Sequence, residues 1–254
     1  MILTSKNNSL IKETIRLKDK KYRKQLGLFI VEGEKMTKEC LNSAFEIERV
    51  FVSQNYQGDK GFLASLQDKI VEVTDAVFQS LTDEKTPQGI LCRVKIPTLS
   101  LKKPVGKCLL LDGVADPGNV GGIIRTANAS GYHQVYLTSQ CADPYSPKSV
   151  RASMSGIFFT QIFIGSREEI LALIQDTPLI VADMKGDNAF TFIPPKRFVL
   201  AIGNEANGIS YETQSQADYT VRIPMRQSQE SLNACVSAGI LMYLLNQDEF
   251  VSME

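Results

Sequence analysis

The sequence predicts an α/β protein with two domains, a small N-terminal domain followed by a larger one built on a mostly parallel sheet. The first observation is that short apolar runs alternate with helical segments along nearly all of the 254 residues, which is typical of a parallel sheet covered by helices on both faces. The second is one interruption at residues 97–107, "PTLSLKKPVGK", which is polar and carries two prolines, as linkers do. We therefore expect domains at residues 1–96 and 108–254.

In the N-terminal domain, Leu10, Ile11, Thr14 and Ile15 recur at helical spacing, which predicts a helix over residues 9–24. Strands and helices alternate after it. We expect strands at 28–33, 47–54 and 89–96, helices at 34–44 and 61–69, and a strand end followed by a helix within 71–82.

In the C-terminal domain the alternation restarts. We expect strands at 108–114, 134–139, 179–184, 198–203 and 219–224, and helices at 119–130, 146–155, 166–175 and 231–246. The last helix is apolar nearly all round from Ala234 to Leu245, so most of its sides must be buried, either in the core or at a subunit interface.

Charge is distributed unevenly, although the chain as a whole is neutral. Residues 1–24 carry eight lysines or arginines against Glu13 and Asp19, a net charge of +6. A basic helix on an otherwise acidic protein favours contact with nucleic acid, although a solvated amphipathic helix would have the same composition.

Composition argues against several other classes of protein. Five scattered cysteines without a C-x-x-C pair argue against a zinc site or a disulfide framework, and a single histidine, His133, argues against histidine-based metal or triad chemistry. The chain has no run of about 18 apolar residues, and its first residues contain no apolar signal core. We expect a cytoplasmic protein with no membrane span and no bound metal.

The first loop with unusual chemistry follows the strand at 108–114 and contains "DPGNVGGIIRTA". A helix that starts near Asn119 offers backbone N–H groups and a positive dipole end to an anion, and Gly121 and Gly122 leave room for another backbone or a ligand. Arg125, six residues after Asn119, would supply a planar fork for phosphate. An ordinary strand-to-helix turn with a surface arginine would look the same. The glycines match neither the dinucleotide fingerprint nor the P-loop, so a nucleotide-binding oxidoreductase is disfavoured.

Two further loops follow strands of the same predicted sheet, whose carboxyl ends form the usual binding edge. The second loop, in "AIGNEANGIS" (201–210), places Glu205 directly after a strand, where it could bind a ligand or tie the loop to backbone donors. The third, "IPMRQSQESLNACVSA" (223–238), places Ser231 where it could be the N-cap of the last helix.

Taken in this order, the three loops resemble the motifs of the SpoU/TrmH family of RNA ribose 2′-O-methyltransferases, within the SPOUT class. The first has the Asn and Arg of the family's first motif, the second has its Gly-x-Glu-x-x-Gly-x-Ser, and the third has Ile-Pro-Met followed by Ser-Leu-Asn. "DPYSPKSVRASMSG" (143–156) resembles a segment that connects these motifs. "FIVEGEKMTKECL" (29–41) is similar to the RNA substrate-binding domain of many members, a small ribosomal-protein-like fold.

The resemblance implies that S-adenosylmethionine donates a methyl group to a ribose 2′-hydroxyl in RNA, with rRNA favoured over tRNA. It implies a deep trefoil knot in the C-terminal domain, an exception to the rule that folds are unknotted, and a homodimer with the active site near its interface. It implies catalytic roles for Asn119, Arg125, Glu205, Ser231 and Asn233. It implies a cofactor pocket formed by Ala201, Ile202, Gly203, Glu205, Ile223, Met225, Leu232 and Asn233.

Arg125 is the residue that this chemistry needs most. A ribose hydroxyl is a weak nucleophile, and an arginine beside the RNA phosphate can position it and stabilise the negative charge that develops on it. A guanidinium almost never deprotonates in a protein, so proton loss assisted by the phosphate competes with Arg125 acting as the base. Asn119 would orient the reacting group.

Four residues at three places depart from the family pattern: Ser155, Gln227 and the pair Ala234-Cys235. A glycine is usual at position 227, and glutamine there could alter the loop or weaken cofactor binding. The alternative function is therefore a non-catalytic RNA-binding or ribosome-assembly protein on the same scaffold. The Asn, Arg, Glu and Ser-Leu-Asn set is complete, which favours an active enzyme.

Overall fold

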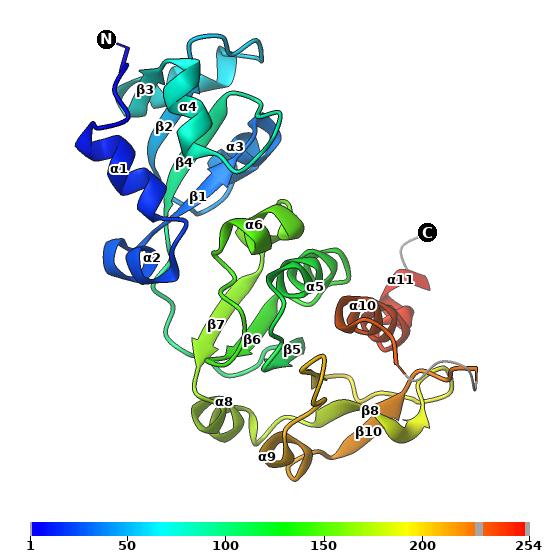
Figure 1. Ribbon diagram of the computed structural model, residues 1–254. Helices are drawn as coiled ribbons and strands as arrows, with labels where there is room; N and C mark the ends of the chain where they lie inside the picture. The colour runs from blue at the N-terminus through cyan, green and yellow to red at the C-terminus, as the bar shows by residue number, and fades with distance from the viewer. Residues whose placement is uncertain (1, 227–230, 252–254) are drawn as a thin grey trace. The chain divides into compact units, whose positions relative to one another are not determined.

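The computed structural model of the chain describes residues 2–226 and 231–251, and they form two compact units (Figure 1). The first unit comprises Met1–Thr98 and Tyr145–Phe158, and the second comprises Leu99–Pro144 and Phe159–Glu254. Residues 96–106 contain no helix or strand. Gln227, the main departure from the family pattern, lies outside the described residues.

The first unit is built on a four-stranded sheet in the order β1-β4-β2-β3. Strand β4 runs antiparallel to β1 and β2, and β3 runs parallel to β2. Its strands are β1 (Leu28–Glu32), β2 (Ile47–Ser53), β3 (Ile70–Val73) and β4 (Ile90–Lys95). Its helices are α1 (Ser9–Arg16), α2 (Lys20–Leu26), α3 (Glu34–Leu41), the 3₁₀ helix η1 (Gly61–Lys69), α4 (Asp75–Leu81) and α6 (Pro147–Ser153); α7 (Gly156–Phe159) begins in it.

The single helix expected over residues 9–24 is wrong, because the chain turns between α1 and α2. Leu17 is fully buried at this turn, and the Asp19 side chain accepts a hydrogen bond from the backbone N–H of Lys21 at 2.7 Å, which caps α2. Arg93 on β4 holds α1 against the sheet, since its guanidinium pairs with Glu13 at 2.7 Å and with Glu48 at 3.0 Å. The N-terminal basic segment is thus an integral part of this unit.

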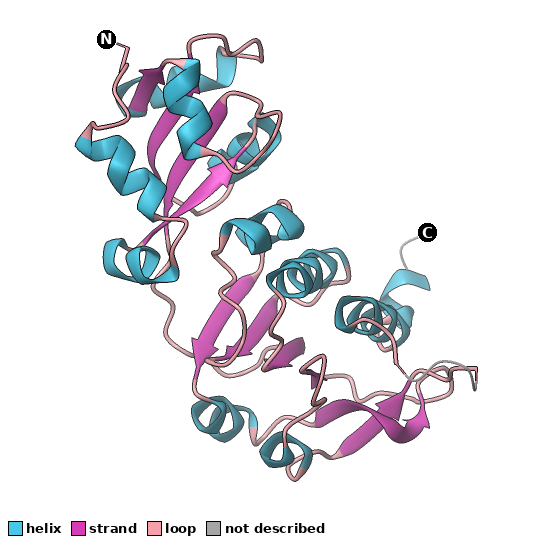
Figure 2. Cartoon of the chain, viewed as in Figure 1, coloured by secondary structure: helices cyan, strands magenta, loops and turns pink. Residues whose placement is uncertain are grey.

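The second unit is built on a six-stranded sheet in the order β10-β8-β9-β5-β6-β7, and every strand pair is parallel, as predicted. Its strands are β5 (Lys107–Asp112), β6 (Gln134–Thr138), β7 (Gln161–Gly165), β8 (Leu179–Asn188), β9 (Phe198–Gly203) and β10 (Tyr219–Arg222). Its helices are α5 (Pro117–Ala129), α8 (Arg167–Ile174), α9 (Tyr211–Gln214), α10 (Ala234–Leu244) and α11 (Gln247–Val251) (Figure 2).

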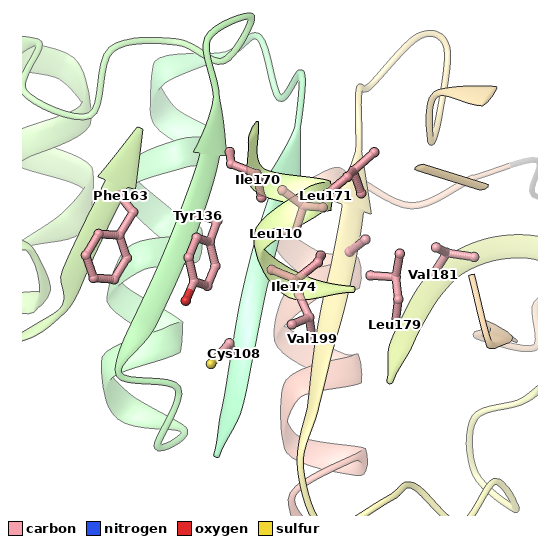
Figure 3. Packing of buried hydrophobic residues seen from close by; sticks show 11 residues of the cluster. Cys108, Leu110, Tyr136, Phe163, Ile170, Leu171, Ile174, Leu179, Val181 and Val199 are labelled. Atoms are coloured by element: carbon pink, nitrogen blue, oxygen red, sulfur yellow. The ribbon is translucent and has the colours of Figure 1, made fainter. Parts of the chain in front are cut away.

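Helices cover both faces of this sheet. On one face, Ile170, Leu171 and Ile174 of α8 pack against Leu110 of β5 and Val199 of β9 in a buried apolar cluster (Figure 3). Helices α5 and α10 lie on the opposite side of the sheet from α8 and α9 (Figure 1). Alternate side chains of each strand therefore meet different helices, which explains why the strands are apolar on both faces.

The strand order places two of the predicted loops side by side. The chain runs from β5 to β6 and β7 on one side, crosses to β8 on the other side, and then forms β9 between β8 and β5. Strands β5 and β9 are therefore neighbours, with Asp112 in register with Gly203. Such a reversal of strand order forms a crevice beyond the carboxyl ends of the strands. The first and second loops leave the sheet there. The trefoil knot stays a prediction.

Candidate active site

A cavity of about 580 Å³ lies at this edge of the second unit. Cavities of roughly 300–1,000 Å³ are the size that holds small-molecule ligands. Its walls come from β8, the loop after β9, the end of β10 and the segment that leads into α10. The lining residues are Ala182, Asp183, Met184, Ile202, Gly203, Asn204, Glu205, Ala206, Gly208, Val221, Arg222, Ile223, Met225, Ser231, Leu232, Asn233, Ala234, Ser237 and Leu241.

Most of the residues predicted for a cofactor pocket line this cavity. They are Ile202, Gly203, Glu205, Ile223, Met225, Leu232 and Asn233. Ala201 is the exception: it is fully buried in the apolar cluster beneath α8. Consecutive residues of a strand point to opposite faces, so Ala201 and Ile202 cannot both turn their side chains to the same cavity.

Glu205 ties the second loop to the first. Its Oε2 accepts a hydrogen bond from the backbone N–H of Ala115 at 2.9 Å, and its Oε1 accepts one from the N–H of Asp116 at 3.1 Å and one from the Asn119 side-chain amide at 2.8 Å. Burial by itself raises the pKa of Glu205, but these hydrogen bonds outweigh it and the net pKa is lowered. The sequence predicted an anion at the start of α5, and the anion found there is this internal carboxylate.

Asn119 joins the third loop to the other two. Its Oδ1 accepts a hydrogen bond from the side-chain amide of Asn233 at 3.0 Å. Asn233 in turn caps α10, because its Oδ1 accepts from the backbone N–H groups of Cys235 and Val236 at 2.9 and 3.2 Å. The N-cap of this helix is therefore Asn233 and not Ser231, which instead lines the cavity.

Arg125 has a different position from the other predicted catalytic residues. It lies in the second half of α5 and its side chain is exposed. Neither Arg125 nor Asn119 is among the residues that line the cavity, but Asn119 is hydrogen-bonded to Glu205 and Asn233, which do line it. Arg125 forms no hydrogen bond or ion pair with any other residue within the part of the chain that the structure describes. A single copy of the chain thus brings Asn119, Glu205, Ser231 and Asn233 together and leaves Arg125 outside the group.

Gly122 of the first loop makes room for a helix. A Cβ atom on Gly122 would lie 2.5 Å from the Sγ of Cys235, so Gly122 lets α10 approach α5 closely. The expectation was room for another backbone or a ligand, and at Gly122 the neighbour is a residue of helix α10 and not a ligand. In the second loop, a Cβ on Gly203 would lie 2.2 Å from the carbonyl carbon of Gly208, so the tight turn at 203–208 requires glycine.

Asp112, which the sequence did not indicate, fastens the far end of the second loop. Its Oδ2 accepts hydrogen bonds from the N–H and the hydroxyl of Ser210 at 3.0 and 2.6 Å, and its Oδ1 accepts one from Arg167 at 2.8 Å. The carboxylate side chain is fully buried. Glu205 and Asp112 therefore hold the loop of residues 203–210 at both ends.

The residues of β8 that line the cavity were also missed. Ala182, Asp183 and Met184 end the predicted strand at 179–184. Because β8 is parallel to β9 and adjacent to it, its carboxyl end reaches the same edge of the sheet, and this was the signal that could have indicated them.

The described residues, 2–226 and 231–251, contain neither a metal-ion site nor a helix that could span a membrane. They contain no group of three or more His, Cys, Asp or Glu side chains that could hold a metal ion. Nor do they contain a helix that is both long enough and apolar enough to cross a membrane.

Residues 106–243 match the SpoU rRNA Methylase family, and residues 8–92 match the MRM3-like substrate binding domain. The chain is 28% identical to the 23S rRNA (guanosine(2553)-2′-O)-methyltransferase RlmP of Bacillus subtilis, over 96% of its own length and 98% of that protein. It is also 28% identical to the 23S rRNA (uridine(2479)-2′-O)-methyltransferase of Streptomyces viridochromogenes, over 95% of its own length and 90% of that protein.

Solved structures agree over nearly the whole chain. The AdoMet-bound rRNA methyltransferase from Sinorhizobium meliloti superimposes with a TM-score of 0.89 at 27% identity, covering 98% of both chains. The SpoU methyltransferase AviRb from Streptomyces viridochromogenes, in complex with AdoMet, gives a TM-score of 0.87 at 26% identity, covering 96% of this chain and 99% of that one. With three motif loops joined at one crevice and a family match that spans more than half of its residues, this chain belongs to the SpoU rRNA methylase family.

Proposed function

We propose that this protein transfers the methyl group of S-adenosylmethionine to a ribose 2′-hydroxyl of ribosomal RNA. Two relatives that are similar over most of their length are named as 23S rRNA 2′-O-methyltransferases, and two solved neighbours hold AdoMet. The observation that carries the proposal is the hydrogen-bonded chain Glu205–Asn119–Asn233, which joins all three motif loops beside the cavity.

The cavity suits this cofactor in size and in chemistry. Ile223, Met225 and Leu232 supply apolar wall for an adenine ring, while Asn204 and Ser231 supply polar atoms. When bound, S-adenosylmethionine supplies a methyl group on a sulfonium, an already strong methyl donor. The protein therefore needs mainly to hold donor and acceptor in line. Glu205 and Asn233 would act by fixing the loops that form the pocket.

Arg125 would act on the RNA. Its guanidinium has no internal partner among the described residues, so it is available to a phosphate. We propose that Arg125 positions the ribose through the adjacent phosphate and stabilises the charge that develops on its 2′-oxygen. Because arginine keeps its proton in proteins, the proton of the hydroxyl would leave to the phosphate.

A homodimer would complete the site. Val236 and Tyr243 on α10 are 50% and 44% exposed, and Ile240 between them is half-buried, so an apolar side of this helix lacks cover in one copy. Helix α10 packs on α5, the helix that carries Arg125. Pairing of two copies through this side of α10 would cover it and place the Arg125-bearing helix at an interface.

The remaining assignments follow the same proposal. Residues 1–96 would bind the RNA substrate, residues 97–107 would link, and residues 108–254 would form the knotted catalytic domain. We place the protein in the cytoplasm, in keeping with the bacterial relatives that are named as 23S rRNA methyltransferases.

Ribose methylation mapping of total RNA tests the proposal. RNA from cells with and without the gene is compared, and one or a few rRNA riboses should lose their 2′-O-methyl group when the gene is absent. Purified protein should restore the same mark on unmodified rRNA when S-adenosylmethionine is added. Identical methylation maps, together with no transfer in vitro, would instead support the non-catalytic alternative.

A further inference from the structure

Strand β8 departs from a regular ladder where it borders the cavity. Val181 pairs with Thr220, and the next pair is Asp187 with Val221, so residues 182–186 loop out between two consecutive residues of β10. Bulges of this kind redirect side chains and are common beside active sites. Of the looped-out residues, Ala182, Asp183 and Met184 line the cavity.

The bulge is held in place by three contacts. A Cβ on Gly186 would lie 2.5 Å from the carbonyl carbon of Thr220 and from the backbone nitrogen of Val221, so only glycine fits there. Arg222 donates a hydrogen bond from Nε to the carbonyl of Gly186 at 3.0 Å. The backbone N–H of Lys185 donates to Oδ1 of Asp183 at 2.9 Å, which fixes the carboxylate.

Asp183 and Glu205 are the carboxylates among the described lining residues, and they differ in what they have left to bind. Glu205 uses both oxygens on donors of the first loop. Asp183 accepts only the N–H of Lys185 within the described part of the chain, and its side chain is half-buried. A carboxylate has room for about four hydrogen bonds, so Asp183 presents unused acceptor capacity to the cavity.

The strand order shows which end of a ligand Asp183 can meet. Asn119 follows β5 and Glu205 follows β9, whereas β8 lies one strand further from β5. Asp183 is therefore separated from the junction where the methyl group must leave. Arg222 also lines the cavity, and its positive charge offsets the negative charge of Asp183. This wall therefore does not select a cationic part of the ligand.

We propose that Asp183 accepts hydrogen bonds from the ribose hydroxyls of the cofactor's adenosine and so selects a methyl donor that carries a ribonucleoside. This assignment rests on the proposed function. A carboxylate at the end of a parallel strand is well suited to this contact, since it accepts from ribose hydroxyls in dinucleotide-binding sheets as well. The bulge places Asp183 at the wall of the cavity. The Lys185 N–H occupies only Oδ1 of this carboxylate, so Oδ2 can accept from the ligand.

Calorimetric titration of the full-length protein tests this assignment without relying on turnover. The ligands are S-adenosylhomocysteine and its 2′-deoxyadenosyl analogue. Wild-type protein should bind the analogue about tenfold more weakly, the effect of one lost hydrogen bond to a charged group. Asp183→Asn should bind S-adenosylhomocysteine about tenfold more weakly than wild type, and its penalty for the missing hydroxyl should largely vanish. Asp187→Asn, an exposed carboxylate of β8 that does not line the cavity, is the matched control and should bind both ligands as wild type does.

Other outcomes overturn the assignment. Equal binding of both ligands by wild type would do so without any variant. If Asp183→Asn still bound the 2′-deoxyadenosyl analogue as much more weakly than S-adenosylhomocysteine as wild type does, Asp183 would meet another part of the ligand. Loss of S-adenosylmethionine binding with unchanged S-adenosylhomocysteine binding would place it at the sulfonium. If wild type bound none of these ligands, the proposed function itself would fail, and this assignment with it.

Discussion

The side-chain amide of Asn119 donates a 2.8 Å hydrogen bond to Oε1 of Glu205, joining residues 86 positions apart. Asn119 sits at the start of α5 and Glu205 directly after β9, and the neighbouring strands β5 and β9 bring them together. Since Glu205 also accepts from two backbone N–H groups of the first loop, one carboxylate fixes the first loop against the second loop, which lines the cavity.

Glu205→Gln should loosen this junction. The amide nitrogen would face donors that now meet an oxygen, so at least one hydrogen bond between the two loops would be lost. We expect affinity for S-adenosylhomocysteine to fall at least about tenfold, with a smaller loss of thermal stability because the loop is at the surface. Calorimetry and thermal unfolding measure the two effects. Glu168→Gln, at the exposed start of α8, is the control; equal affinity in both variants would contradict the role given to Glu205.

Asp112→Asn should reduce stability in a pH-dependent way. Burial by itself raises the pKa of Asp112, but the hydrogen bonds from Ser210 and Arg167 outweigh it and hold the pKa below its ordinary value of 3.8. A depressed carboxylate pKa stabilises the folded state above pH 3.8, and this contribution is lost as the pH falls through the folded-state pKa. Removing the charge leaves Arg167 without its buried partner, which costs about 3 kcal/mol.

Urea unfolding of wild type and Asp112→Asn measures this difference. It should stay near its full value between about pH 5 and 8 and shrink below about pH 4. Asp187→Asn, which is exposed, should match wild type throughout. A difference that stayed constant down to pH 3 would mean that ionisation of Asp112 contributes nothing.

The fold and much of the site could be predicted because parallel order brings strand ends to one edge. The strands predicted at 108–114 and 198–203 were enough to place the loops after them at the same edge. The sequence could not show which of Ser231 and Asn233 caps α10, since serine and asparagine both cap helices well. The choice is settled by Asn119, which holds Asn233 from another helix.

Other features depend on packing that local sequence does not encode. The break at Leu17 and Asp19 contains neither glycine nor proline, and it exists because Leu17 has a core to enter. Strand β7 was not predicted. It lies in an apolar run just after α7, where periodicity alone does not separate a helix from a strand. The bulge at residues 182–186 closes on the backbone of β10, a strand distant in sequence.

Arg125→Ala should remove nearly all methyl transfer while leaving the fold and cofactor binding intact. The side chain is exposed, forms no internal pair within the described residues and does not line the cavity, so its loss should leave thermal unfolding unchanged. Loss of one preorganised donor to developing charge costs roughly 10²–10³ in rate. Single-turnover methylation of rRNA measures the rate, and Arg197→Ala, an exposed arginine outside the cavity, is the control. Normal turnover in Arg125→Ala would remove this residue from the mechanism.

The basic N-terminal segment should supply part of the salt-dependent affinity for RNA. Two of its cations serve the fold: Lys18 pairs with Asp83 at 2.7 Å, and buried Arg23 donates to the carbonyl of Leu17 at 2.8 Å. The exposed ones are Lys6, Lys12, Arg16, Lys20, Lys21 and Lys24. Substitution is a better test than deletion, since deleting residues 1–24 would also remove the buried Ile11 and Leu17.

Replacement of Lys12, Lys20 and Lys24 by glutamine should weaken RNA binding most at low salt. The slope of log affinity against log salt should become shallower by roughly 0.7 for each phosphate of single-stranded RNA that the protein no longer neutralises. Filter binding at several salt concentrations gives the slope. The same replacement at Lys102, Lys103 and Lys196, which are exposed outside residues 1–96, is the control. An unchanged slope in the first variant would make the segment a solvated surface.

Val236→Glu should separate the proposed dimer and abolish methyl transfer together. Val236 is 50% exposed on α10, beside the half-buried Ile240, so a carboxylate there would be desolvated only if a second copy covers the helix. An unpaired charge buried at an interface costs about 3 kcal/mol or more, so the dissociation constant should rise at least about 100-fold. Sedimentation velocity over a concentration series measures it, and S-adenosylhomocysteine titration checks that the pocket survives. Tyr211→Glu, at an 84% exposed position on α9, should leave the dimer unchanged. A wild type that sediments as a monomer would rule out the proposed dimer and leave Arg125 to reach the RNA from within one chain. An active Val236→Glu dimer would place the interface elsewhere.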